Sequence, residues 1–343
     1  MKKIYFLLDY LDRFSSKYPS KPYRSGMNKN LLISEFKKYN YEIIYLHYTD
    51  IDFRNKNYEG VIFLYTSSED NELYYKSFIE DIILGLELKG AIVIPSYKFL
   101  RAHHNKVFME ILRDTNDLTV VKNIESQHFG TLEDFDRYNK KIPIPGVFKT
   151  SSGSTSSGVR KYKSKNELRK IIKKHTRTKD LNYEFRDLAR SIRHNGYKKE
   201  SLFRKKFLIQ NLIQGLDRDW KILIFGEKYF VLERSVRKND FRASGSGIFE
   251  FKKELPDGIL NYAMRFFKTL NLPFLSLDVA YDGSSYYLIE FQTLYFGTVT
   301  LVNSPFYFKL DDDNSKWLCI DDKTIFEKEF TISVCQYLES NAI

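Results

Sequence analysis

Two carboxylates and one amide share a face of a predicted β-hairpin between residues 275 and 292. The runs LSLDVAY and YYLIEFQ flank a polar turn, and a three-residue loop at 283–285 places Asp278 opposite Glu290. Gln292 has the same parity as Glu290, so three oxygen donors face one way. The opposite parity carries apolar residues that must face the core, namely Leu277, Val279, Ile289 and Phe291.

This polar face is typical of a cation site. Directly opposed residues on neighbouring strands have Cβ atoms ~5 Å apart, so two carboxylates there repel each other unless a cation lies between them. Magnesium prefers oxygen ligands and commonly bridges ATP phosphates. The sequence therefore predicts Asp278, Glu290 and Gln292 as magnesium ligands. The alternative is a solvated polar face with one unfavourable pair.

A Ser- and Gly-rich segment could bind phosphate. Eight consecutive Ser, Thr or Gly residues occupy positions 151–158, directly after the strand-like run 145–149. Such a segment offers many backbone N–H and hydroxyl donors to phosphate oxygens. It is not a P-loop, because Val159 stands where the motif requires lysine. A flexible linker is the alternative, but the short apolar strand before the segment favours a phosphate-binding flap.

Two arginines flank another polar stretch. Arg234 and Arg242 lie in RSVRKNDFRASGSG, whose Gly and Ser content suits the close approach of a ligand. Isolated arginines are usually surface residues, so this signal is weak alone. The sequence contains no GxSxG or other nucleophile motif.

The elements that must position these residues begin with an alternating α/β region. Strand-like runs occur at 4–10, 41–48, 60–67 and 91–96, with helical patterns between them. This alternation predicts a parallel, Rossmann-like sheet. No GxGxxG follows the first strand, so we do not expect dinucleotide binding there.

The regular alternation of strand and helix patterns ends near residue 101. A long, basic, mostly helical stretch follows the Ser- and Gly-rich segment to about residue 206, and antiparallel strand patterns come after it. Helical patterns at 257–270 and near 327–338 complete the chain. These changes predict a mixed α/β protein with three parts, at 1–100, 101–206 and 207–343.

Composition limits the classes of partner. The chain has 343 residues, 43% of them hydrophobic, and a net charge of +11, which favours anionic partners. Much of the positive charge lies in 160–206, where a solvated helical face is the main interpretation and substrate or nucleic-acid binding the alternative. No segment approaches ~18 uninterrupted apolar residues, and Cys319 and Cys335 lack a CxxC spacing. We therefore expect a cytoplasmic protein without membrane insertion.

Together, in this order, the segments resemble the ATP-grasp superfamily, especially its glutathione synthetase and ribosomal-protein glutamate ligase branch of carboxylate-amine ligases. The resemblance covers nearly the whole chain. It implies a Rossmann-like domain at 1–100, then a small ATP-grasp lobe at 101–206 with a glycine-rich flap and a basic helical insertion. A catalytic lobe with the metal site and a C-terminal helix would occupy 207–343.

The resemblance implies roles for individual residues. Lys106 and Lys149 match the lysines that contact ATP phosphates, and the flap over the outer phosphates would comprise Ser151, Gly153, Ser154, Ser156, Ser157 and Gly158. LIQNLI is similar to the hinge strand that holds adenine, which implicates Gln210, Asn211, Leu212 and Ile213. Lys221 would bind ATP where many relatives have arginine. Arg234 and Arg242, eight positions apart, would be catalytic. Asp278, Glu290 and Gln292 match the metal ligands, with Gln292 in place of the usual asparagine.

The implied activity uses ATP and Mg²⁺ to activate a carboxylate as an acyl phosphate, which an amine captures as an amide. The substrates would be small-molecule, carbohydrate or peptide carboxylates and amines. Nucleic acid is not expected as a partner, and a homodimer stays open. Two alternatives stay open: an ATP-grasp kinase that stops at a phosphorylated product, and a non-catalytic module that binds nucleotides or nucleic acid.

Overall fold

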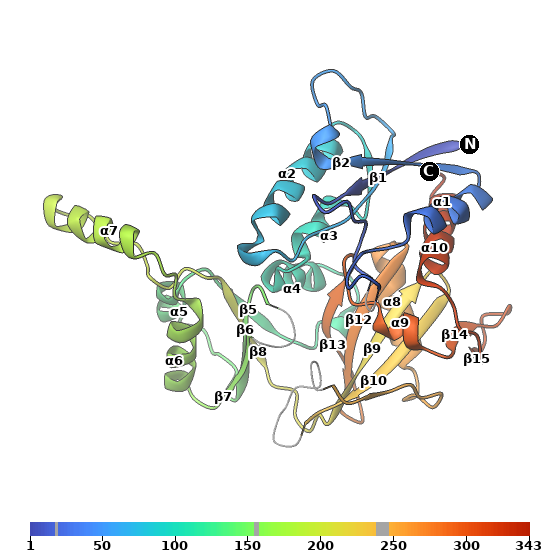
Figure 1. The fold of residues 1–343 in the computed structure, drawn as a ribbon. Helices are drawn as coiled ribbons and strands as arrows, with labels where there is room; N and C mark the ends of the chain where they lie inside the picture. The colour runs from blue at the N-terminus through green and yellow to red at the C-terminus, as the bar shows by residue number, and fades with distance from the viewer. Residues whose placement is uncertain (18–19, 154–157, 238–246) are drawn as a thin grey trace. The chain divides into compact units, whose positions relative to one another are not determined.

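The computed structural model describes residues 1–17, 20–153, 158–237 and 247–343 (Figure 1). The chain forms two compact units. Unit 1 comprises residues 1–103, 116–121 and 216–343, and unit 2 comprises residues 104–115 and 122–215. No helix in the described ranges is both long enough and apolar enough to span a bilayer.

Unit 1 begins with a four-stranded parallel sheet in the order β2-β1-β3-β4, as the alternating pattern predicts. Its strands are β1 (Lys2–Leu8), β2 (Tyr41–His47), β3 (Ile62–Tyr65) and β4 (Ile92–Ile94). The accompanying helices are α1 (Lys29–Lys38), α2 (Tyr74–Leu88) and α3 (Tyr97–Ala102), with short 3-10 turns at Tyr48–Asp50 and Asn71–Leu73. The central strand β1 is apolar on both faces: Phe6 joins one hydrophobic cluster and Leu7 joins another.

Unit 1 also contains a seven-stranded sheet in the order β13-β12-β9-β10-β14-β15, with β11 paired to β10. Its strands are β9 (Arg218–Phe225), β10 (Lys228–Ser235), β11 (Phe249–Glu250), β12 (Phe274–Tyr281), β13 (Tyr286–Gln292), β14 (Tyr307–Leu310) and β15 (Trp317–Ile320). The strand pairs are antiparallel. Gly226, with a φ of 56°, begins the two-residue turn between β9 and β10.

Three helices accompany this sheet: α8 (Ile259–Leu270), α9 (Val299–Asn303) and α10 (Phe326–Ser340). The 3-10 turn Thr119–Val121 also belongs to unit 1. α8 and α10 confirm the helices predicted from periodicity. Phe330 of α10 contacts Phe6, Phe36 and Phe274, so one core joins the parallel sheet to the seven-stranded sheet.

Unit 2 is built on a four-stranded antiparallel sheet in the order β5-β8-β6-β7. The strands are β5 (Ser126–Phe129), β6 (Gly146–Thr150), β7 (Val159–Tyr162) and β8 (Phe207–Asn211). The helices are α4 (Lys106–Asp114), α5 (Leu132–Arg137), α6 (Lys165–Thr176) and α7 (Leu181–Arg193). Phe148 and Phe207 pack against Leu168 and Ile172 of α6 in the core of this unit.

The unit boundary differs from the predicted one at residue 206. β8 was assigned to the third part of the chain, but it pairs with β5 and β6 and therefore belongs to unit 2. The chain enters unit 1 again only at Leu216. Strand composition carries no information on which sheet a strand joins, and here the partners lie upstream, in 126–150.

Candidate active site

The hairpin β12–β13 places Asp278 directly opposite Glu290, as predicted, and it places Ser276 opposite Gln292. The turn that produces this register differs in length from the prediction. Tyr281 pairs with Tyr286, so the turn contains four residues, 282–285, rather than three. A one-residue shift between Asp278 and Val279 restores the register.

Because of this bulge, the residues of β13 that face the core differ in part from those predicted. Leu277, Val279 and Phe291 are buried as expected. Ile289 was also expected in the core, but Leu288 pairs with Val279 and takes the buried position. The extra residue in the bulge changes the alternation on one side of it, which explains the difference.

Two basic residues lie beside Asp278 on the same face of the sheet. Lys221 of β9 pairs with Asp278 in the strand register, and its Nζ lies 2.9 Å from Ser276 Oγ and 3.5 Å from Asp278 Oδ1. Arg234 of β10 donates from Nε to Asp219 Oδ1 at 2.6 Å, and its second amino group forms an ion pair with Asp278 Oδ2 at 2.9 Å. Arg234 thus bridges two carboxylates.

The pKa values of the two carboxylates that Arg234 contacts are shifted in opposite directions. Burial raises the pKa of Asp219 to about 6 in spite of Arg234. Burial also acts on Asp278, but the adjacent Arg234 and Lys221 charges prevail and lower its pKa to about 2. The carboxylates in turn raise the pKa of Arg234 above its ordinary value. Asp278 is therefore ionised at neutral pH.

The donor set of this face fits a hard cation. Asp278 and Glu290 face each other, and Gln292 donates from Nε2 to Glu290 Oε1 at 3.3 Å, which orients its amide beside the carboxylate. All three side chains offer oxygen, the ligand that Mg²⁺ prefers. Asp278 shares its oxygens with Lys221 and Arg234 in the present structure, so a bound ion would compete with these cations for it.

Unit 2 brings together the predicted phosphate-binding residues at the start of α4. The backbone N–H of Lys106 donates to Ser151 O at 2.8 Å, and Lys106 Nζ donates to Gly153 O at 2.6 Å. Asn105, which caps α4, accepts from Ser151 Oγ at 3.0 Å. Lys106 therefore lies against the first residues of the predicted flap, Ser151 and Gly153.

Lys149 and Gly158 lie where β6 and β7 meet. Lys149 is buried and is in register with Val159 and Leu208. Thr150 donates its backbone N–H to Gly158 O at 3.1 Å. A Cβ added at Gly158 would lie 1.8 Å from Thr150 Oγ1, so this position has no room for a side chain without a shift of Thr150.

Polar side-chain contacts connect the predicted adenine strand to the start of β5. Asn211 accepts the backbone N–H of Glu125 at 2.8 Å, and Gln210, which is buried, donates from Nε2 to Ser126 Oγ at 2.8 Å. Leu212 and Ile213 follow directly after β8. β8 and the start of β5 are thus held together by side chains as well as by the strand ladder.

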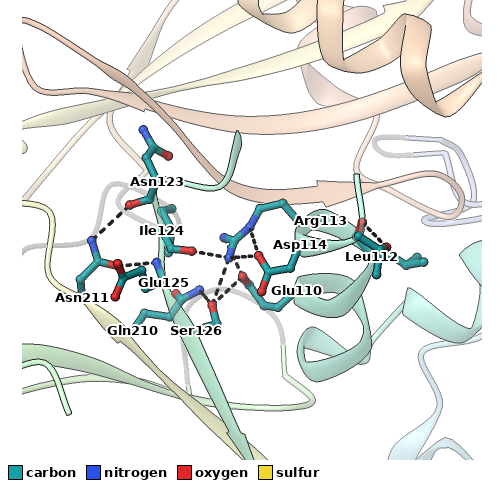
Figure 2. Close-up of polar contacts among 11 residues, drawn as sticks. Glu110, Leu112, Arg113, Asp114, Asn123, Ile124, Glu125, Ser126, Gln210 and Asn211 are labelled. Atoms are coloured by element: carbon teal, nitrogen blue, oxygen red, sulfur yellow. Dashed lines mark hydrogen bonds and ion pairs between the residues drawn. The ribbon is translucent and has the colours of Figure 1, made fainter. Parts of the chain in front are cut away.

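Figure 2 shows that the same Ser126 hydroxyl connects to a buried arginine on α4. Arg113 is only 1% exposed, and it forms an ion pair with Glu110 Oε2 at 2.6 Å. It also donates to Asp114, to Ile124 O and to Ser126 Oγ, and Ser126 Oγ donates to Glu110 Oε2 at 2.9 Å. The network joins α4, which begins at Lys106, to the strand pair that includes Gln210.

The sequence did not single out Asp219, Glu110 or Arg113. Asp219 has one detectable signal, since it precedes Lys221 by two positions and so shares its face of a strand. Glu110 and Arg113 have the i, i+3 spacing of a helical ion pair, but that spacing is typical of exposed pairs as well. Ser154, Ser156, Ser157 and Arg242 lie outside the described residues.

No family model matches the sequence, and no curated protein matches it. Solved structures do match over nearly the whole chain. The D-alanine–D-alanine ligase from Bacillus anthracis has a TM-score of 0.53 at 14% identity, covering 100% of this chain and 99% of that one. The D-cycloserine synthetase DcsG has a TM-score of 0.53 at 12% identity, covering 98% and 99%.

A third similar structure is a RiPP-associated ATP-grasp ligase from Chryseobacterium gregarium, solved in complex with ADP and a leader and core peptide. Its TM-score is 0.52 at 14% identity, and the match covers 100% of this chain and 98% of that one. The chain therefore shares its fold with these three enzymes, one of which is an ATP-grasp ligase, and this agrees with the fold that the sequence predicts.

Proposed function

We propose that the chain is an ATP-dependent carboxylate-amine ligase that forms an amide through an acyl phosphate. The observation that supports this most directly is the polar face of the seven-stranded sheet. There, Asp278 faces Glu290 while Lys221 and Arg234 lie beside it. A fold shared with ATP-using ligases, together with this arrangement of acidic and basic groups, suits phosphoryl transfer without a covalent nucleophile.

In the proposed reaction each unit supplies different groups. In unit 2, Lys106, Lys149 and the segment from Ser151 to Gly158 would bind the phosphates of ATP. The backbone that follows Gln210, at Asn211, Leu212 and Ile213, would bind the base. In unit 1, Asp278, Glu290 and Gln292 would hold Mg²⁺, which neutralises phosphate charge when bound. Lys221 and Arg234 would bind oxygens of the transferring group.

The proposed reaction has two steps. A carboxylate oxygen of the first substrate attacks the γ-phosphorus of ATP, the bond to the β,γ-bridging oxygen breaks, and ADP leaves. The amine of the second substrate then attacks the acyl carbon, loses a proton and displaces phosphate. The products are an amide, ADP and phosphate. Arg234 is held between two carboxylates, which would orient its guanidinium for both steps.

The similar structures narrow the substrate class only in part. The first is a D-alanine–D-alanine ligase, the second a D-cycloserine synthetase, and the third a ligase in complex with a leader and core peptide. Carboxylates and amines on either small molecules or peptides are therefore the substrates to test.

Isotope transfer tests the proposal directly. Pools of amino acids and peptides labelled with ¹⁸O in their carboxylates would be incubated with ATP, Mg²⁺ and the full chain. A ligase should release phosphate that carries one ¹⁸O from the carboxylate, together with ADP and an amide. A kinase would leave the phosphoryl group on its product. Absence of ADP formation with every pool would favour a non-catalytic nucleotide-binding module.

The Glu290→Ala variant is the control for this assay. It removes a predicted magnesium ligand and should abolish the isotope transfer. If the variant releases labelled phosphate as fast as the wild type, the activity comes from elsewhere.

A further inference from the structure

The net positive charge of the chain comes from unit 2. Residues 104–115 and 122–215 contain 25 Lys or Arg and 11 Asp or Glu, a balance of +14, whereas the whole chain carries +11. The residues of unit 1 are therefore slightly acidic in sum. An anionic partner is attracted to unit 2 in particular, and not to the chain as a whole.

Helix α6 lies along one side of the β5–β8 sheet of unit 2 and presents cations to solvent (Figure 1). It buries Leu168 and Ile172 in the core of this unit. At 3.6 residues per turn, the opposite half of the helix carries five exposed cations, namely Lys165, Arg169, Lys170, Lys173 and Lys174. Every exposed residue of α6 is polar, so this half of the helix offers no apolar surface. We refer to Lys170, Lys173 and Lys174 as the lysine triplet.

The charge on the exposed half of α6 is largely uncompensated. Arg169 forms an ion pair with Asp136 of α5 at 2.7 Å. The lysine triplet forms no ion pair with any residue that the structure describes. Glu167, the one carboxylate in the sequence of the helix, lies in its first turn. The triplet is therefore available to an external anion.

Strand β7 extends this basic surface. Burial lowers the pKa of His175 on α6, and the nearby charges of Arg160 and Lys174 lower it further. Arg160 of β7 thus lies near the end of α6 that carries Lys174. Lys161, which follows Arg160 on β7, is exposed, and so is Lys163 between the strand and the helix. The cations of β7 and α6 form one continuous region of positive charge.

This region lies on the side of the sheet that faces away from the proposed ATP site. Phe148 of β6 packs against Leu168 and Ile172 of α6. Lys149 is the next residue of the strand, so its side chain points to the opposite face of the sheet. A ligand on α6 and the phosphates of ATP would therefore occupy different faces of unit 2.

We propose that the exposed half of α6, together with β7, binds the phosphate backbone of a nucleic-acid duplex without sequence preference. Residues four apart rise ~6 Å along a helix, so the cations recur at regular intervals on a helix that is ~18 Å long. A nucleic-acid strand carries one phosphate per ~3.4 Å of its axis, so α6 spans about five of them. No aromatic side chain is exposed on α6 to stack with unpaired bases, which favours a duplex over a single strand.

This proposal does not depend on the ligase activity proposed above. The basic composition of 160–206 left nucleic-acid binding open, although the family resemblance does not imply it. The structure adds that the charges lie together on one exposed surface, without apolar residues on α6 and opposite the ATP face of the sheet.

Two other anionic occupants fit this surface less well. Interfaces with polypeptides depend on buried aromatic and apolar anchors and are depleted in Lys, whereas the exposed half of α6 is rich in Lys and has no apolar residue. A membrane-bound helix inserts its apolar face into the lipid, but the apolar face of α6 is buried in the core of unit 2.

Fluorescence anisotropy with a labelled DNA duplex tests the proposal on the full chain. A duplex of ~20 base pairs should bind saturably at about 0.1 M salt, and a duplex of unrelated sequence should bind equally well. The logarithm of the binding constant should fall linearly with the logarithm of the salt concentration, because phosphate contacts release counterions. Replacing the lysine triplet by Gln should reduce the magnitude of this slope by about 2 to 3 and weaken binding ~10-fold or more at about 0.1 M salt.

A matched variant of unit 1 separates the contribution of α6 from that of net charge. Lys3, Lys56 and Lys89 are also exposed, and replacing all three by Gln removes the same charge from the chain. This control should keep the salt dependence of the wild type. Both triple variants should keep the wild-type melting temperature, since all six positions are exposed. ATP and Mg²⁺ should not displace the duplex from the wild type.

Five outcomes would overturn the proposal. The first is no saturable binding of the duplex, and the second is an equal loss of affinity in the two triple variants. The third is displacement of the duplex by ATP, which would place it in the nucleotide site. The fourth is a poly-glutamate peptide that binds more tightly than the duplex and depends on the lysine triplet, which would identify an acidic polypeptide as the partner. The fifth is cosedimentation with phosphatidylglycerol vesicles that the triplet variant abolishes, which would identify a membrane.

Discussion

Asp278 and Glu290 face each other across β12 and β13 because a one-residue shift follows Asp278. Without that shift, the pairing of Tyr281 with Tyr286 would place Asp278 opposite Ile289. The bulge therefore determines which side chain meets Asp278.

Glu290→Ala should abolish ATP turnover and leave the melting temperature unchanged, because the Glu290 side chain faces the proposed metal and not the core. ADP release and thermal unfolding would be measured on the same preparation. The exposed Glu254→Gln is a matched control that should affect neither. Full turnover in the Glu290 variant would rule out this residue as a required metal ligand.

Asp219→Asn should change how stability depends on pH. A carboxyl group with a raised folded-state pKa binds its proton more tightly in the folded protein, so it favours folding increasingly as pH falls from about 6 towards 4. The wild type should therefore gain stability relative to the variant over this interval, by on the order of 2 kcal/mol. Urea unfolding at several pH values would show this. A difference that does not vary with pH would mean that Asp219 titrates normally.

Arg113 and Glu110 should behave as a coupled pair. Arg113→Met leaves the buried Glu110 carboxylate without its cation and should lower the free energy of unfolding by ~3–5 kcal/mol. Combining it with Glu110→Gln should cost less than the sum of the two single changes. Unfolding titrations of the four proteins complete this cycle, and additive effects would contradict a direct interaction.

Gly158→Ala should weaken unit 2 because the new methyl group meets Thr150 Oγ1. Thr150→Ala removes that oxygen, so the double variant should recover part of the lost stability. Proteolysis of unit 2 at rising temperature would follow both effects. If Thr150→Ala gives no recovery, the contact is not the cause.

The sequence predicted those parts of the fold that depend on local pattern. Alternating strands and helices indicated the parallel sheet, and the apolar spacing in 257–270 indicated α8. The face shared by Asp278 and Glu290 followed from parity, although the assumed three-residue loop was wrong and the bulge compensated for it. The assumed loop was one residue too short and the bulge was not foreseen, so the two errors cancelled. Periodicity alone could not have ensured this result.

Contacts between distant segments could not be predicted in this way. β8 pairs with strands that lie some 60 to 80 residues upstream, and no local pattern specifies such a partner. The same reason explains why Gln210 was assigned to adenine binding without its contact to Ser126. Asp219, in contrast, lies only 15 positions before Arg234, so the register of the β9–β10 hairpin could have identified this pair. The functional roles of these residues stay predictions.

Phe330 of α10 lies in one core with Phe6 and Phe36. During synthesis these two residues leave the ribosome some 300 residues before the helix that covers them. The apolar side chains of the parallel sheet that α10 covers are therefore exposed until this helix has been synthesised. Exposed apolar surface of this kind makes a partly synthesised chain prone to aggregation.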